Sequence, residues 1–133
     1  MPKVLFAILC DDVRQEVAGK FSLMGIFGQF HVSDFRNPLP PFNIYAKIEF
    51  EQAGNFPIEV EFRSVEGQRI FQLRGSVAVE EPTQGRIIGI LNLKLENLRL
   101  PRHGEYEVVI IYNNQPLSVL PVEVVIPPQR FLQ

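Results

Sequence analysis

The segment Ile58-Glu59-Val60-Glu61-Phe62-Arg63 alternates apolar and charged residues without a break. Successive side chains of a β-strand point to opposite faces of a sheet, so this alternation predicts a strand that is buried on one face and wet on the other. The pattern continues on both sides of this segment, in residues 42–51, 69–79, 87–96 and 105–113. In residues 42–51, Ile44 and Ile48 belong to the predicted buried face and Tyr45 to the wet face.

The whole chain divides into about eight predicted strands. They are residues 3–10, 20–30, 42–51, 57–65, 69–79, 87–96, 105–113 and 117–126. Glu66-Gly67 and Asn113-Asn114 predict tight hairpins because Gly and Asn adopt positive φ easily. Longer connections are expected at 11–19, 33–41 and 80–86. Regular short strands with turn signals between them are typical of a sandwich. We therefore predict one all-β domain over residues 1–133, a two-sheet antiparallel β-sandwich of immunoglobulin-like, Greek-key topology.

One local motif supports this topology. Residues 100–106, Leu-Pro-Arg-His-Gly-Glu-Tyr, have the form of a tyrosine corner. In such a corner, a Tyr near the start of a strand returns its hydroxyl to the backbone a few residues upstream. We expect Tyr106 to make this bond, with Gly104 forming the bend.

Composition excludes several classes of protein. The formal charge is −2, and Lys and Arg are scattered singly, which argues against a nucleic-acid-binding surface. No apolar stretch approaches the ~20 residues of a membrane-spanning helix. Residues 4–10 are apolar, but Asp11-Asp12 stands where a signal peptide would need small residues. Cys10 is the single cysteine, and we expect an inert core thiol in a cytoplasmic protein.

The sequence offers few residues for catalysis or metal binding. His31 and His103 have no recognisable nucleophile or orienting partner nearby and are expected to be exposed. Gly25 and Gly28 lack the spacing of a phosphate loop and are expected to mark a bulge or close packing. Two acidic pairs at predicted strand ends are weak candidates for a Ca²⁺-like site. They are Asp11, Asp12, Glu80 and Glu81. Solvated turns are the favoured explanation of both pairs, and pairing of Asp12 with Lys20 across the first hairpin is an alternative structural role for Asp12.

The proline-rich connection at 33–41 is flanked by aromatic residues. A stiff loop of this kind presents an apolar patch to a partner, or it folds down as a plug over one end of the sandwich. The candidate partner-binding residues are Phe30, Phe35, Leu39 and Phe42. Phe131, near the end of the chain, is a further aromatic of the same kind.

The stretch from Ile8 to Arg14, followed by Gly19-Lys20 and Gly25-Ile26-Phe27, resembles a family of short uncharacterised bacterial proteins. These proteins carry a similar Cys-Asp pair and a Gly-Lys segment near the start, and a Gly-x-Tyr strand like Gly104-Glu105-Tyr106 near the end. The resemblance spans nearly the whole chain. It implies a small cytoplasmic β-sandwich and no particular activity.

These observations favour a non-catalytic module for protein binding or assembly, by self-association or with an unknown protein partner. The second hypothesis is a metal or small-ligand site on the loops. An enzyme is the least supported reading, since a fold alone specifies no chemistry. We expect no cofactor, and no nucleic-acid or membrane partner.

Overall fold

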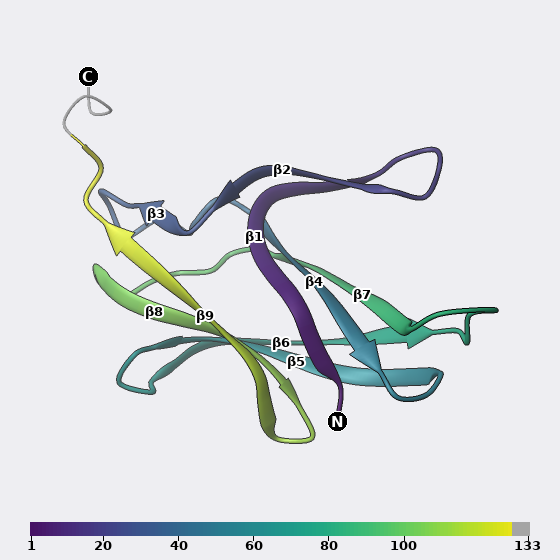
Figure 1. The fold of residues 1–133 in the computed structure, drawn as a ribbon. Helices are drawn as coiled ribbons and strands as arrows, with labels where there is room; N and C mark the ends of the chain where they lie inside the picture. Colours follow the sequence, from purple (N-terminus) through teal and green to yellow (C-terminus); the bar gives the residue numbers. More distant parts are fainter. Residues whose placement is uncertain (129–133) are drawn as a thin grey trace.

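The chain forms nine strands and no helix within residues 1–128, the part that the computed structural model describes. The strands are β1 (Lys3–Gln15), β2 (Phe21–Phe27), β3 (Gln29–His31), β4 (Phe42–Phe50), β5 (Gly54–Ser64), β6 (Arg69–Val79), β7 (Ile87–Leu95), β8 (Gly104–Tyr112) and β9 (Gln115–Val125). They make two sheets, β2-β1-β4-β7 (sheet A) and β3-β9-β8-β5-β6 (sheet B) (Figure 1). All neighbouring strands are antiparallel except β3 and β9, which are parallel.

The strand order confirms the predicted immunoglobulin-like sandwich. In that fold, strands A, B and E lie in one sheet and strands C, F and G in the other. Here β1, β4 and β7 take the first three positions, and β5, β8 and β9 take the other three. The chain crosses from one sheet to the other between β4 and β5, between β6 and β7, and between β7 and β8, as Greek-key connections require.

The core is built from the alternating residues that the sequence predicted. Both sheets contribute side chains with no exposed surface, among them Ile44, Ile48, Ile58, Phe62 and Ile110. The two tight turns are also confirmed. Gly67 adopts a φ of 98°, while Asn113 and Asn114 adopt 52° and 63°, as a two-residue hairpin with two left-handed residues requires.

The first hairpin differs from the prediction. Residues 11–15, expected in a connection, extend β1, and the expected strand 20–30 is divided at Gly28 into β2 and β3. The pairing of β1 with β4 ends at Cys10 opposite Asn43, so Asp11–Gln15 pairs with β2 alone. Figure 1 shows the cause: β1 rises from the N-terminus, bends sharply, and continues with β2 as a two-stranded arm (residues 11–25).

The arm explains why Tyr45 is buried although its position predicts a wet face. Tyr45 projects from the outer face of sheet A, yet only 3% of its surface is exposed. The Phe21 ring of the arm lies 5.5 Å from the Tyr45 ring, and the Phe6 ring of β1 lies 5.8 Å from it. The arm therefore folds over sheet A and gives it a small second apolar cluster on the outside.

The bend depends on a glycine. Gly25 has a φ of +68°, and a Cβ atom placed there would collide with the side chain of Asp11 on the adjacent strand. The register of β1 and β2 is the same on both sides of Gly25, so Gly25 does not mark a bulge. Of the two expectations for this glycine, a bulge and close packing, the structure supports close packing, against the side chain of Asp11.

The predicted tyrosine corner is present. The Tyr106 hydroxyl donates a hydrogen bond of 2.6 Å to the carbonyl oxygen of Arg102, and Gly104 adopts a φ of 142° between them. Tyr106 is 2% exposed and its ring lies 5.5 Å from that of Phe62. The bond therefore fixes the start of β8 against the core.

We predict that Tyr106→Phe destabilises the protein by about 1–2 kcal/mol, because the hydrogen bond from the buried tyrosine to the Arg102 carbonyl is lost. Urea unfolding followed by circular dichroism measures this change. The matched control is Tyr112→Phe, which removes a hydroxyl from a half-buried ring at the other end of the same strand and is expected to cost less than about 0.5 kcal/mol. Equal losses in the two variants would contradict a special role for the corner.

We predict that Gly25→Ala destabilises the protein by about 1–3 kcal/mol, because alanine disfavours the left-handed conformation and meets Asp11. Gly28→Ala is the control, since a Cβ there meets nothing within 4 Å and Gly28 has no positive φ. Adding Asp11→Ala to Gly25→Ala is expected to recover part of the loss by removing the collision. No recovery would show that the backbone conformation alone sets the cost.

Candidate functional site

The four acidic candidates do not form one site. Asp11 follows Cys10, which lies opposite Asn43 near the start of β4. Glu80 and Glu81 follow β6 and precede β7, whose first residue Ile87 lies opposite Phe50 at the far end of β4. At ~3.3 Å per residue, the stretch of β4 from Asn43 to Phe50 separates the two pairs by roughly 20–25 Å. The hypothesis of a metal site shared by Asp11, Asp12, Glu80 and Glu81 is therefore wrong.

Each member of the first acidic pair has a structural role. Asp12 accepts hydrogen bonds from the backbone N–H of Val13 (2.9 Å) and from the Arg14 side chain (3.2 Å). It lies opposite Met24, so the alternative of pairing with Lys20 is also wrong. Asp11 lies over Gly25 at the bend. Within residues 1–128, no three His, Cys, Asp or Glu side chains come together in a way that would hold a metal ion.

Cys10 lies in the interior, with no exposed surface. Burial raises the pKa of the thiol, and the negative charge of Asp11 raises it further. A thiol kept protonated is a poor nucleophile and a poor metal ligand. The expectation of an inert core cysteine agrees with this environment.

The proline-rich connection is a plug and not a protruding patch. Phe30, Leu39 and Phe42 are buried, and Phe35 is half-buried against the same cluster. The Phe30 ring packs edge-on against Phe42 at 5.0 Å. Two alternatives were open for these four candidate partner-binding residues, an exposed apolar patch and a plug over one end of the sandwich. The burial of their side chains supports the plug. Phe131 lies outside the described residues.

Hydrogen bonds fasten this plug to the loop before β8. The Leu39 amide donates to the carbonyl of Leu98 (2.8 Å), and the Arg99 side chain donates to the carbonyl of Arg36. His103 Nε2 lies 2.6 Å from the Val32 carbonyl and must donate to it, since a carbonyl oxygen only accepts. His103 is thus half-buried, in contrast to the predicted exposure, whereas His31 is exposed as expected.

A hollow lies beside the plug, where β2 ends and β3 begins. Its volume is ≈ 340 Å³, and the buried rings of the plug form its apolar floor. Ile26 on its rim is 63% exposed, and Pro40 and Pro41 stand exposed on the opposite wall. Asp11 supplies a carboxylate at its edge. The hollow therefore brings Asp11, a candidate metal ligand, together with Phe30, Leu39 and Phe42, which were candidate partner-binding residues.

β2 itself is the second component of this site. It is the end strand of sheet A, and its seven residues, Phe-Ser-Leu-Met-Gly-Ile-Phe, include no charge and no proline. Met24 and Ile26 are exposed along it. An end strand presents unpaired backbone groups, and natural proteins usually protect such an edge with charges or proline. No prediction from the sequence identified this edge, although the uncharged run between Lys20 and His31 was its signal.

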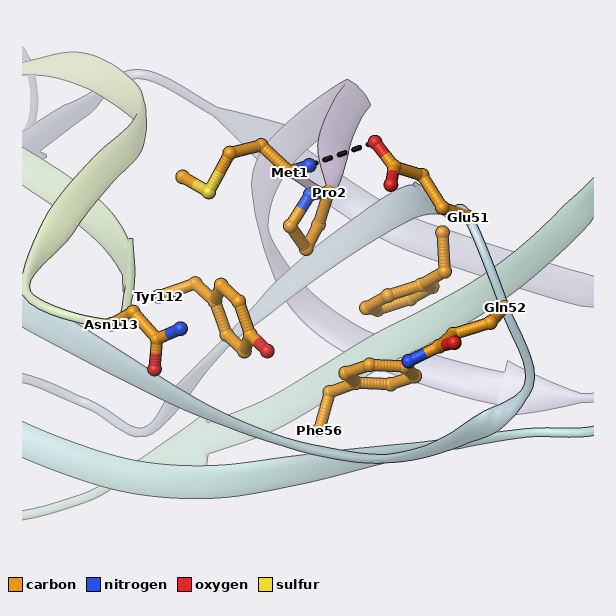
Figure 2. A pocket seen from close by; sticks show the side chains of 8 residues that line it. Met1, Pro2, Glu51, Gln52, Phe56, Tyr112 and Asn113 are labelled. Carbon is orange, nitrogen blue, oxygen red and sulfur yellow. Dashed lines mark hydrogen bonds and ion pairs between the residues drawn. The ribbon is translucent and has the colours of Figure 1, made fainter.

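A second cavity of ≈ 320 Å³ lies at the opposite end of the sandwich. Figure 2 shows it between the turn after β4, the turn after β8 and the N-terminus of the chain. Its walls are Phe50, Phe56 and Tyr112, and the amino group of Met1 donates a hydrogen bond of 2.8 Å to Glu51 at its rim. This bond and the ammonium charge lower the pKa of the Glu51 carboxyl.

No helix in the described part of the chain is long and apolar enough to cross a membrane. No curated protein matches the sequence. Among solved structures, the chain is similar to an immunoglobulin-like protein from Pseudomonas aeruginosa, with 11% identity and a TM-score of 0.47, over 93% of this chain and 96% of that one. The predicted bacterial origin and the diagnostic value of the hairpin motifs stay predictions. The model of a family of unknown function, DUF6941, matches residues 5–125, and the chain therefore belongs to this family.

Proposed function

We propose that the protein is a non-catalytic assembly module in which β2 pairs antiparallel with β2 of a second copy. Adding a strand to an exposed sheet edge is a common mode of protein recognition, with backbone hydrogen bonds giving affinity and side-chain pockets giving specificity. The observation that carries the proposal is the uncharged, proline-free edge of β2 beside an apolar hollow.

The other strand edges are less suited to pairing. β6 and β7 lie against each other where the two sheets meet, with Gly75 and Gly89 at the contact. β3 has three residues. β9 is covered by β3 only over residues 123–125, but the rest of it carries Pro116 and Pro121, which cannot donate to a new strand.

The register of such a pair brings complementary groups together. With Met24 on the two-fold axis, Phe21 of one copy lies opposite Phe27 of the other, since Met24 is the middle residue of β2. The arm tip of each copy then reaches the hollow of the other. The tip carries Val17, an apolar residue that is fully exposed, and Lys20, whose charge complements Asp11 at the edge of the hollow.

The compartment belongs to the same proposal. A single cysteine that is buried and protonated suits a reducing environment, and we infer that the module works in the bacterial cytoplasm.

We predict that the protein sediments as a dimer. Met24→Lys is expected to weaken the affinity of this dimer at least about tenfold, because two lysines then face each other across the axis. The matched control is Ile88→Lys. Ile88 is exposed to a similar extent as Met24, 41% against 44%, and it lies on β7, the strand at the opposite edge of the same sheet. The control is expected to leave the dimer intact.

Mixing Met24→Lys with Met24→Glu sharpens this experiment. Opposite charges across the axis are expected to restore association as a mixed dimer, while each variant alone stays weak. A wild-type protein that sediments as a strict monomer would overturn self-association. An equal loss from Ile88→Lys would place the interface elsewhere.

A further inference from the structure

The cavity in Figure 2 lies far from β2, at the end of the sandwich where β4 and β8 finish. Two turns and the start of the chain meet there. Phe50 ends β4, Phe56 lies near the start of β5, and Tyr112 ends β8. Nothing in the proposed dimer occupies this end, so the cavity calls for an explanation of its own.

The walls of the cavity are aromatic rings in two orientations. Phe50 and Phe56 are stacked, with ring centroids 4.4 Å apart and an angle of 20° between the planes. The Tyr112 ring is tilted by 65° to Phe56, with the centroids 6.2 Å apart. Phe50 is 4% exposed, and Phe56 and Tyr112 are half-buried. The two ring orientations, held by packing, form an aromatic corner in the wall of the cavity.

The rim carries one full negative charge and a cation already bound to it. Glu51 accepts the hydrogen bond from the Met1 ammonium, and both residues line the cavity with the rings. Figure 2 shows this bond, with Pro2 beside it, above the aromatic side chains. The remaining lining residues, Gln52 and Asn113, are neutral, so the Met1 ammonium is the one positive group among the lining residues.

We propose that this cavity is a binding site for a small organic ammonium ion of the quaternary or methylated type. Aromatic corners attract such ions because the ring faces are negative and methylated ammonium groups give up water readily. Glu51, the one charged side chain among the lining residues, supplies the counter-charge. The volume lies at the lower end of the range for small-molecule sites.

Choline is the probe, and its neutral carbon isostere, in which a tert-butyl group replaces trimethylammonium, is the matched ligand control. Titration of the full chain is followed by NMR on the Tyr112 ring and the Met1 methyl group. Choline is expected to bind about 2- to 30-fold more tightly than the isostere, the range of a cation–π contribution. Equal affinities would overturn the proposal, because shape alone would then account for binding.

Variants test whether the Glu51 carboxylate and the Tyr112 ring each contribute to the affinity for choline. Glu51→Gln and Tyr112→Leu are each expected to weaken choline at least about threefold, whereas Tyr112→Phe keeps the ring and keeps the affinity. Glu66→Gln is the control for the carboxylate, because Glu66 is also exposed, also pairs with a cation (Arg102), and lies outside the cavity. An equal loss from Glu66→Gln would overturn the assignment.

Acetylation of the N-terminus removes the internal competitor. Since Met1 then no longer holds Glu51, choline is expected to bind severalfold more tightly to the acetylated chain. Weaker binding would show that the ammonium group does not occupy the ligand position. This site and the proposed dimer are tested by different variants, so one can fail without the other.

Discussion

The two sheets come into contact where Gly89 of β7 faces Val77 and Val79 of β6. A Cβ atom at Gly89 would overlap both valines, and one at Gly75 would meet Leu93. These contacts bring the end strands of the two sheets together and close one side of the sandwich. Closure there withdraws two strand edges from solvent. On the other side, the chain passes from β2 directly to β3 and so changes sheet, which leaves the outer edge of β2 without a neighbour among the described strands.

The bend at Asp11 and Gly25 controls what that edge can do. Without it, β1 and β2 would continue straight beyond the sandwich as a hairpin supported by nothing else, and two strands alone are only marginally stable in water. Because the arm folds over sheet A, Phe21 finds Tyr45 and the hairpin gains an apolar contact. The same geometry sets the arm tip and the hollow at opposite ends of β2, the arrangement that a two-fold pair requires.

Periodicity was enough to predict the sandwich, most of its strands, both tight hairpins and the tyrosine corner, because each depends on residues close in sequence. The failures concern contacts between distant segments. Asp11-Asp12 and Glu80-Glu81 look alike in sequence, but strand register places them at opposite ends. Tyr45 has the parity of a wet residue and is covered by Phe21, which comes from an arm that no local pattern indicates. The hollow and the aromatic corner each combine three or more segments, so neither had a local signal.

His103 joins two parts of the fold. It lies within the tyrosine corner, and its Nε2 reaches across to the Val32 carbonyl at the edge of the plug. In the neutral tautomer that makes this bond, Nε2 carries the hydrogen and Nδ1 does not. In the imidazolium both nitrogens carry a hydrogen. The donor is therefore present in either protonation state. This hydrogen bond ties the tyrosine corner to the 33–41 connection, so a displacement of either segment has to be shared by the other.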